Sequence, residues 1–267
     1  MAKKGARIII AGRNESKCRE AIKKLQSESG GSLDLDYVQL DLKSLKSAKV
    51  AGLAIVAKEK KLSGIILNAG IMATPYELTD DGVEAQFQVN HLAHFVLVRE
   101  LMELLESSGK VSFGLSSTRQ CDRSEYRLTS LYDRQADGKP ARVISLSSFA
   151  HNFFSLYPFA SPKFTSLADV NRAYDPLGYI RYSQAKLANI LFVRELNKRA
   201  KNVRAVAVHP GFVASSLYEA QPLLRPFVGT FISVDEGAFS SLWAATSSEL
   251  DEKDLWFVMP HSVIIND

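Results

Sequence analysis

Tyr182-Ser183-Gln184-Ala185-Lys186 leads directly into the apolar run Leu187-Ala188-Asn189-Ile190-Leu191-Phe192-Val193. A tyrosine and a lysine four residues apart lie on one face of a helix, with about 5–6 Å between their Cβ atoms. Because an opposite charge stabilises the ionised form of a phenol, Lys186 is expected to lower the pKa of Tyr182 and to prepare it for proton exchange. Helical periodicity alone supports a plainer alternative, in which the tyrosine packs and the lysine is solvated.

Apolar, β-branched runs alternate with helical stretches along the chain. Strands are expected at residues 7–11, 37–41, 64–68, 142–146 and 203–208, with one more short strand in the tail 256–267. Helices are expected at residues 15–27, 44–61, 82–105, 182–199 and 233–245. This alternation indicates an α/β fold with a parallel sheet. The first run, Arg7-Ile8-Ile9-Ile10-Ala11, is continuous, which is typical of a strand buried on both faces.

The composition narrows the class of protein. The chain has 267 residues, 46% of them hydrophobic and 23% charged, as in an ordinary soluble domain. A net charge of +4 lacks the basic excess of a nucleic-acid binder. No apolar run reaches the roughly 18–20 residues of a membrane span. Cys18 and Cys121 show no disulfide or metal spacing, so we expect a reducing compartment, a cytoplasmic location and no metal site.

Residues 109–140 interrupt the alternation of strands and helices. They are polar, rich in Ser and Arg, and without periodicity. More than about 15 residues without regular structure are unusual inside a compact domain. We therefore expect a single domain over residues 1–267, with 109–140 as an insertion.

Polar or glycine-containing motifs follow three of the expected strands. Asn68-Ala69-Gly70 follows the third strand, Ser147-Ser148 the fourth and His209-Pro210-Gly211 the fifth. In open α/β sheets, ligands bind at the carboxyl ends of the strands. The helix of Tyr182 begins after the Ser147-Ser148 strand, so its first turns can face the same edge.

Together with Asn90-His91-Leu92-Ala93-His94-Phe95, these motifs resemble the short-chain dehydrogenase/reductase family. The sequence around Tyr182 and His209 is most similar to that of the family's retinol-dehydrogenase-like branch, which also includes the WW-domain oxidoreductase. The resemblance covers about Lys4 to Leu250. It implies a Rossmann-like, doubly wound parallel sheet in three layers and an oxidoreductase that moves hydride between a nicotinamide cofactor and a carbonyl or alcohol.

The resemblance also implies roles for four residues. Tyr182 would be the general acid/base, and Lys186 would lower its pKa and hold the nicotinamide ribose. Ser148 would bind and polarise the substrate oxygen. Asn90 would anchor a water that links Lys186 to bulk solvent in a proton relay.

The serine position needs a choice between two similar stretches. Residues 109–117 also resemble a strand that ends in Ser-Ser. Ser117 lies 65 residues before Tyr182, whereas Ser148 lies 34 residues before it. Family members place this serine closer to the tyrosine, so Ser148 is the candidate.

The resemblance implies NADP as cofactor in preference to NAD. An acidic residue after the first expected strand would bind the ribose 2′-hydroxyl of NAD, whereas an arginine suits the 2′-phosphate of NADP, and Arg13 stands there. The implied cofactor-binding residues are Arg13, Asp41, Asn68, Ala69, Gly70, Tyr182, Lys186, Pro210, Gly211, Val213 and Ser215.

One family feature is missing from this sequence. The family begins with a strand and a Thr-Gly-x-x-x-Gly-x-Gly turn, which brings backbone amides to the pyrophosphate. Only six residues precede Arg7, and they contain no such turn. We therefore expect an N-terminally incomplete fold with unpaired strand edges. An active, truncated reductase is the leading interpretation, and a catalytically inactive relative that acts as a binding or regulatory protein is the alternative.

The substrate and partners follow only from the resemblance. Aromatic residues between Phe153 and Phe164, with Leu217 to Val228, suggest an apolar pocket rim that is compatible with a small lipophilic carbonyl, retinal-like or steroid-like. A homodimer through the helices of Asn90 and Tyr182 is implied by the family. An association of a longer form with the endoplasmic reticulum membrane is the alternative to a cytoplasmic location.

Overall fold

The computed structural model describes residues 1–109, 139–156, 161–174, 176–219, 225–252, 255–259 and 264–265. The expected insertion lies outside these residues, except for its ends. The strands are β1 (Ile8–Gly12), β2 (Leu35–Gln39), β3 (Gly64–Leu67), β4 (Ala141–Leu146), β5 (Val203–Val208), β6 (Phe257–Val258) and β7 (Ile264–Ile265). The five strands expected before the tail are confirmed to within two residues at most ends, and the tail holds two short strands.

The helices alternate with these strands as expected. They are α1 (Glu15–Ser29), α2 (Leu45–Lys58), α3 (Ala85–Phe87), α4 (Ala93–Ser108), α5 (Leu167–Val170), α6 (Tyr179–Arg199), α7 (Ser216–Glu219), α8 (Val234–Thr246) and α9 (Glu249–Glu252). Shorter 3-10 helices occupy Ala2–Lys4, Phe149–Leu156 and Arg225–Thr230. Side-chain caps start α1 and α2, with Asn14 accepting from the Lys17 amide and Ser44 from the Ser47 amide.

One expected helix is interrupted. Residues 82–105 were expected to form a single helix, but a π-helical turn at Gln88–Leu92 separates α3 from α4. This turn carries Asn90, whose side chain bonds the backbone of Ile71. Such π-helical turns are frequent at functional sites.

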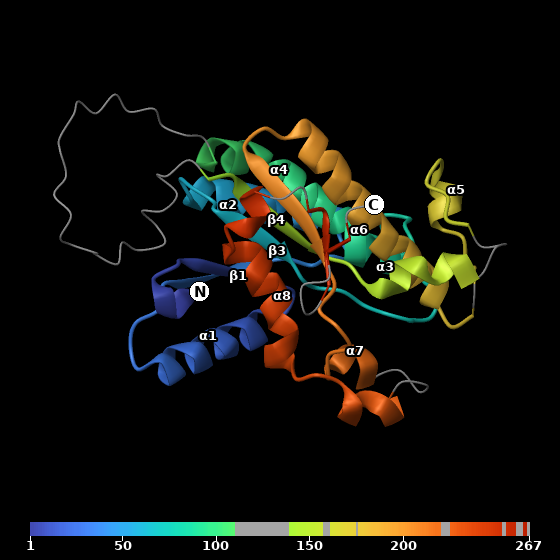
Figure 1. Ribbon diagram of the computed structural model, residues 1–267, viewed down its shortest axis with the longest axis horizontal. Coiled ribbons are helices and arrows are strands. Elements are labelled where there is room, and N and C mark those ends of the chain that lie inside the picture. Colours follow the sequence, from blue (N-terminus) through green and yellow to red (C-terminus); the bar gives the residue numbers. More distant parts are fainter. Residues whose placement is uncertain are drawn as a thin grey trace.

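The strands form two groups rather than one continuous sheet. β1 pairs in parallel with β2, and a second sheet has the order β3-β4-β5-β6-β7, parallel except for β7. Helices α2, α4 and α6 cover one face, and α1 and α8 lie on the other (Figure 1). The arrangement is an α/β, Rossmann-like fold in three layers.

The expectation that Arg7–Ala11 is buried on both faces was wrong. Ile8, Ile9 and Ile10 in β1 are only partly buried, and no residue of α1 is buried. Within the described ranges, β1 pairs with β2 alone and β3 with β4 alone. Ile66 in β3 is 37% exposed, whereas every residue of β4, which has a neighbour on each side, is buried. The burial of each strand therefore follows its place in the sheet.

The core joins the two groups of strands. One apolar cluster contains residues from β2, α2, β3, α4, β4, α6 and β5, with Ile9 of β1 packed against it. A second cluster places α8 and α9 against β4, β5 and β6. None of the helices described is both long and apolar enough to cross a membrane.

Candidate active site

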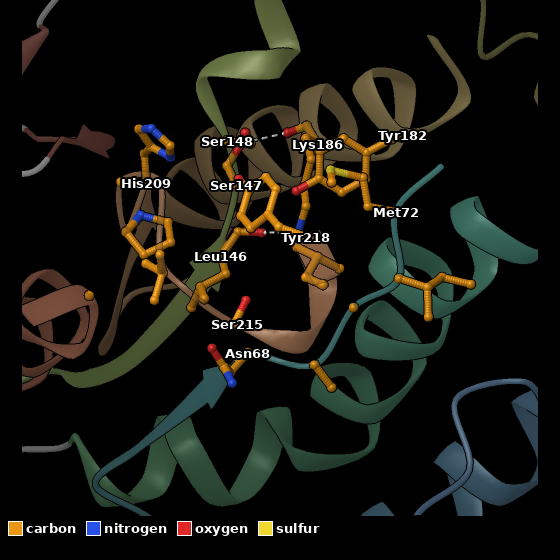
Figure 2. Close-up of a pocket in the computed structure, with 18 of the residues that line it drawn as sticks. Asn68, Met72, Leu146, Ser147, Ser148, Tyr182, Lys186, His209, Ser215 and Tyr218 are labelled. Atoms are coloured by element: carbon orange, nitrogen blue, oxygen red, sulfur yellow. Dashed lines mark hydrogen bonds between the residues drawn. The ribbon is translucent and has the colours of Figure 1, made fainter. Parts of the chain in front are cut away.

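A cavity of about 960 Å³ opens at the carboxyl ends of β3, β4 and β5. Figure 2 shows Asn68 at the tip of β3, Leu146, Ser147 and Ser148 at the end of β4, and Tyr182 and Lys186 projecting from α6. His209 and Ser215 follow β5, and Met72 lies on the loop after β3. Four segments that are far apart in the sequence therefore converge on one space, as the three strand-end motifs predict.

Tyr182 lies in the first turn of α6, four residues after Gly178, and is 5% exposed. Burial raises the pKa of Tyr182 above its ordinary value, and the neighbouring Tyr218 raises it further, while the Ser148 side chain near its hydroxyl acts in the opposite direction. The expected lowering of this pKa is absent from the structure, because burial outweighs the favourable contacts.

The ammonium of Lys186 lies between the Tyr182 ring and the end of β4. Its Nζ lies 5.4 Å from the centre of the Tyr182 ring and donates to the carbonyl of Leu146 across 2.8 Å. Burial lowers the pKa of Lys186 to about 8. The ammonium is thus directed at the end of β4, and its proton is held more weakly than that of an exposed lysine.

The two serines after β4 have different surroundings. Ser147 donates its hydroxyl to the Lys186 carbonyl across 2.8 Å, which ties the end of β4 to α6. Ser148 accepts from the Ala150 amide at 3.1 Å and lines the cavity with Tyr182. This geometry favours Ser148 as the serine that faces a reacting group; its catalytic role stays a prediction.

Asn90 is engaged by the segment that follows β3. Its side chain accepts from the amide of Ile71 and donates to the carbonyl of Ile71, both at 2.8 Å. A Cβ added at Gly70 would lie 2.7 Å from Asn90 Oδ1, so the close approach requires glycine. The water-relay role of Asn90 stays a prediction.

Sequence reasoning missed a polar network behind Lys186. Asn189 donates to the carbonyls of Asn90 at 3.1 Å and Leu146 at 3.0 Å, and its Oδ1 lies 3.0 Å from Nδ1 of His91. Nδ1 of His94 lies 3.3 Å from the same Asn90 carbonyl. The available signal was helical spacing, because Asn189 lies three residues after Lys186 and one turn places both on the same face.

The expected cofactor-binding residues separate into two groups. Seven of them line the cavity with Tyr182 and Lys186: Asn68, Ala69, Gly70, Pro210, Gly211, Val213 and Ser215. Arg13 and Asp41 do not line it. Arg13 is exposed after β1, and Asp41 follows β2, where it accepts from the Lys43 amide.

Tyr218 is a cavity residue that sequence reasoning did not single out. It lies on α7, is buried, and packs in a cluster with Met72 and Tyr182. Its ring centre lies 5.0 Å from that of Phe231. The expected aromatic rim is only partly described. Phe164 packs on Phe87 with ring centres 6.2 Å apart, and the side chains of residues 153–160 lie outside the described part.

Comparisons with known proteins agree with this arrangement. A family model for short chain dehydrogenases matches residues 1–119. A short-chain dehydrogenase/reductase, drtF, from Aspergillus calidoustus is 32% identical over 95% of this chain and 76% of its own length. Retinol dehydrogenase 12 from Mus musculus is 35% identical over 94% of this chain and 69% of its own length.

A solved structure supports the fold. Gluconate 5-dehydrogenase from Burkholderia cenocepacia, in complex with NADP and tartrate, has a TM-score of 0.63 to this chain. The match covers 97% of this chain and 85% of that one at 15% identity, so it bears on the fold alone. The sequence relatives and this fold show that the chain belongs to the short-chain dehydrogenase/reductase family, in its retinol-dehydrogenase-like branch, and that it is an oxidoreductase.

Proposed function

We propose that the protein transfers hydride between NADP and a carbonyl or alcohol group of a small lipophilic substrate, with Tyr182 as general acid/base. One observation carries the proposal: Ser148, Tyr182 and Lys186 meet in the cavity that the ends of β3 and β5 also line. A nicotinamide and a substrate carbonyl need a shared, enclosed space of this kind.

The residues in the cavity fit the nicotinamide end of the cofactor. Lys186 has a buried ammonium for ribose hydroxyls, and Gly70 and Gly211 line the cavity with main-chain atoms only. When bound, the nicotinamide supplies or accepts the hydride. Among the described residues that line the cavity, Lys186 is the only one charged at neutral pH, so the polar groups there orient ligands mainly by hydrogen bonding.

The chain's own residues can then move the proton. The hydroxyl of Tyr182 gives a proton to the substrate oxygen in reduction and takes it back in oxidation. Ser148, which lines the same cavity, holds that oxygen with a second hydrogen bond. Lys186 supplies positive charge behind the tyrosine, which stabilises the phenolate after the proton has left.

The preference for NADP rests on Arg13. It is exposed at the end of β1, and in the described ranges no carboxylate lies within ion-pair distance of it. The nearby Glu15 pairs with Arg19 at 2.7 Å instead. A free guanidinium suits a 2′-phosphate, so Arg13→Ala should weaken NADPH binding and leave NADH binding unchanged.

The lipophilic substrate rests on the cavity lining. Met72, Val213, Leu217 and Leu242 line it, and the buried Tyr218 lies beside Tyr182. An apolar lining with a few polar groups around one reacting position is typical of a site for a small apolar ligand. Retinal-like and other apolar aldehydes and ketones are therefore the substrates to test first.

A second candidate is a protein that binds a ligand without turnover. It is favoured by one observation, that Arg13 and Asp41 lie outside the cavity that holds Tyr182. Titration with NADPH and NADH, followed by nicotinamide fluorescence, separates the two candidates. Saturable binding with carbonyl-dependent oxidation of NADPH supports the enzyme, and a folded chain that binds neither cofactor supports the alternative.

A homodimer through α4 and α6 is also proposed. Phe95 and Leu191 are 40% and 42% exposed on these helices, and Phe95 packs on Phe192 with ring centres 5.7 Å apart. Exposed apolar groups on adjacent helices suit a second copy of the chain. Light scattering of the wild type and of Phe95→Asp tests this: a dimer that becomes monomeric supports the interface.

A further inference from the structure

The loop after β3 forms one wall of the cavity. Ile71, Met72, Ala73, Thr74 and Pro75 all line it, and these residues are called the wall segment below. The segment has no regular secondary structure. Ala73 has a φ of 50°, which an alanine adopts at a cost. The surrounding structure must therefore hold this backbone in place.

Three buried side chains hold the wall segment. Asn90 bonds both polar backbone groups of Ile71. Gln86 accepts from the amide of Ala73 at 2.8 Å. Arg181 donates to the carbonyl of Thr74 at 3.0 Å. Side chains thus take the place that a neighbouring strand would have in a sheet.

Arg181 connects this wall to the catalytic helix. It directly precedes Tyr182, and its guanidinium pairs with Glu84 at 2.7 Å, with both side chains 1% exposed. It also lies 5.5 Å from the ring centre of Tyr76, just beyond the wall segment. A fully buried ion pair is a poor source of net stability, which raises the question of what else this pair does.

The contacts meet at Gly178, where α6 begins. Gln86 donates to its carbonyl at 2.9 Å, and its φ is 77°. A Cβ there would lie 2.8 Å from the Arg181 guanidinium, 2.9 Å from Gln86 Nε2 and 2.9 Å from the Thr74 carbonyl. The start of the helix, the wall segment and the buried pair therefore fit together without spare room.

We propose that Glu84 and Arg181 are positioning residues that fix the wall segment against the start of α6, and so set which carbonyl substrates fit beside Tyr182. The inference rests on the proposed function for its substrate. Its structural content is independent of that function. Neither residue lines the cavity, so both act through the wall segment rather than by touching a substrate.

The chain offers a matched control. Arg142 donates to both carboxylate oxygens of Asp251 at 2.8 and 2.9 Å and to the Ala244 carbonyl, with side chains 8% and 19% exposed. Neither Arg142 nor Asp251 lines the cavity. Arg142→Met removes a buried, ion-paired arginine, as Arg181→Met does, but it leaves the partly exposed Asp251 unpaired and does not touch the wall segment.

The first readout is amide hydrogen exchange of a peptide that spans the wall segment. Arg181→Met, Glu84→Gln and the double variant, which leaves no unpaired charge, should each speed this exchange about 10-fold or more, whereas Arg142→Met should not. Equal exchange in the double variant and the wild type would overturn the proposal. So would the same acceleration in Arg142→Met.

The second readout is kinetic. Because a loosened wall impairs substrate placement, KM for bulky ketones should rise about 10-fold in the double variant, while kcat changes by less than about 3-fold. Unchanged KM values and unchanged selectivity between bulky and small ketones would overturn the specificity role. If the wild type turns over no carbonyl, the proposed function fails, and the exchange measurement still decides the role of the pair.

Discussion

Asn189 donates a hydrogen bond to the main-chain carbonyl of Asn90 across 3.1 Å, joining α6 to the π-helical turn. The same amide donates to the carbonyl of Leu146, which also accepts from Lys186. The lysine, the end of β4 and the Asn90 turn are therefore held by one side chain. Asn189 and Lys186 therefore share one acceptor at the end of β4.

Asn189→Ala should lower kcat more than it raises KM. The substitution leaves two buried carbonyls without this donor, which costs about 1–3 kcal/mol in unfolding free energy. It also frees Lys186 to move relative to Tyr182, so the basic limb of the pH–rate profile should shift. Asn189→Asp keeps the shape but loses the donor, and should behave similarly. A normal pH profile in both variants would show that Asn189 is only structural.

The lowered pKa of Lys186 predicts that the protein becomes more stable at alkaline pH. Its pKa is about 8 in the folded protein and 10.5 in the unfolded chain. Between these pH values the unfolded chain binds more protons than the folded protein, so the free energy of unfolding rises with pH. The gain should reach about 2 kcal/mol by pH 10, before the raised pKa of Tyr182 begins to oppose it.

Urea unfolding from pH 7 to pH 10 measures this gain as the difference between the wild type and Lys186→Met. The variant should lack the gain, since methionine fills the site without a charge. If the unfolding free energies of the two proteins changed with pH in the same way, the account of Lys186 as buried and weakly protonated would be contradicted.

The buried histidines predict a loss of stability at acid pH. Burial lowers the pKa of His91 to about 4 and that of His94 to about 3, and the charge of Lys186 lowers that of His94 further. The unfolded chain is protonated first as the pH falls below about 6.5, so stability is lost from there downward. His94→Gln should flatten the loss between pH 6.5 and pH 4 in urea unfolding. An unchanged slope would show that His94 is protonated in the folded protein.

The two groups of strands predict different hydrogen exchange. β1 has one pairing neighbour in the described ranges and β4 has two. Amides of Ile8–Gly12 should therefore exchange faster than those of Ala141–Leu146, because opening β1 breaks fewer contacts. Protection of β1 equal to that of β4 would mean that another segment pairs with its free edge.

Local patterns account for most of the elements and for much of the cavity. Strand runs, the caps Asn14 and Ser44, and the motifs after β3, β4 and β5 are short-range signals, and the structure confirms the elements they predict. Because parallel strands end at one edge, the same patterns also bring Asn68, Ser148 and Gly211 to one cavity.

Long-range relationships could not be predicted from these patterns. The burial of Ile8–Ile10 depends on which strands flank β1, which their own sequence does not encode. Glu84 and Arg181 are 97 positions apart, and Arg181 read alone is a charged helix residue. The pKa of Tyr182 depends on burial, which helical spacing to Lys186 does not reveal.

The central claim is that Tyr182 exchanges a proton with a carbonyl substrate reduced at the expense of NADPH. The most direct measurement is NADPH oxidation by the purified chain with apolar aldehydes and ketones, for the wild type and Tyr182→Phe. The account predicts carbonyl-dependent turnover that falls at least about 100-fold in the variant, with NADPH binding retained. Turnover that survives Tyr182→Phe, or a folded wild type that binds NADPH without reducing any carbonyl, would contradict it.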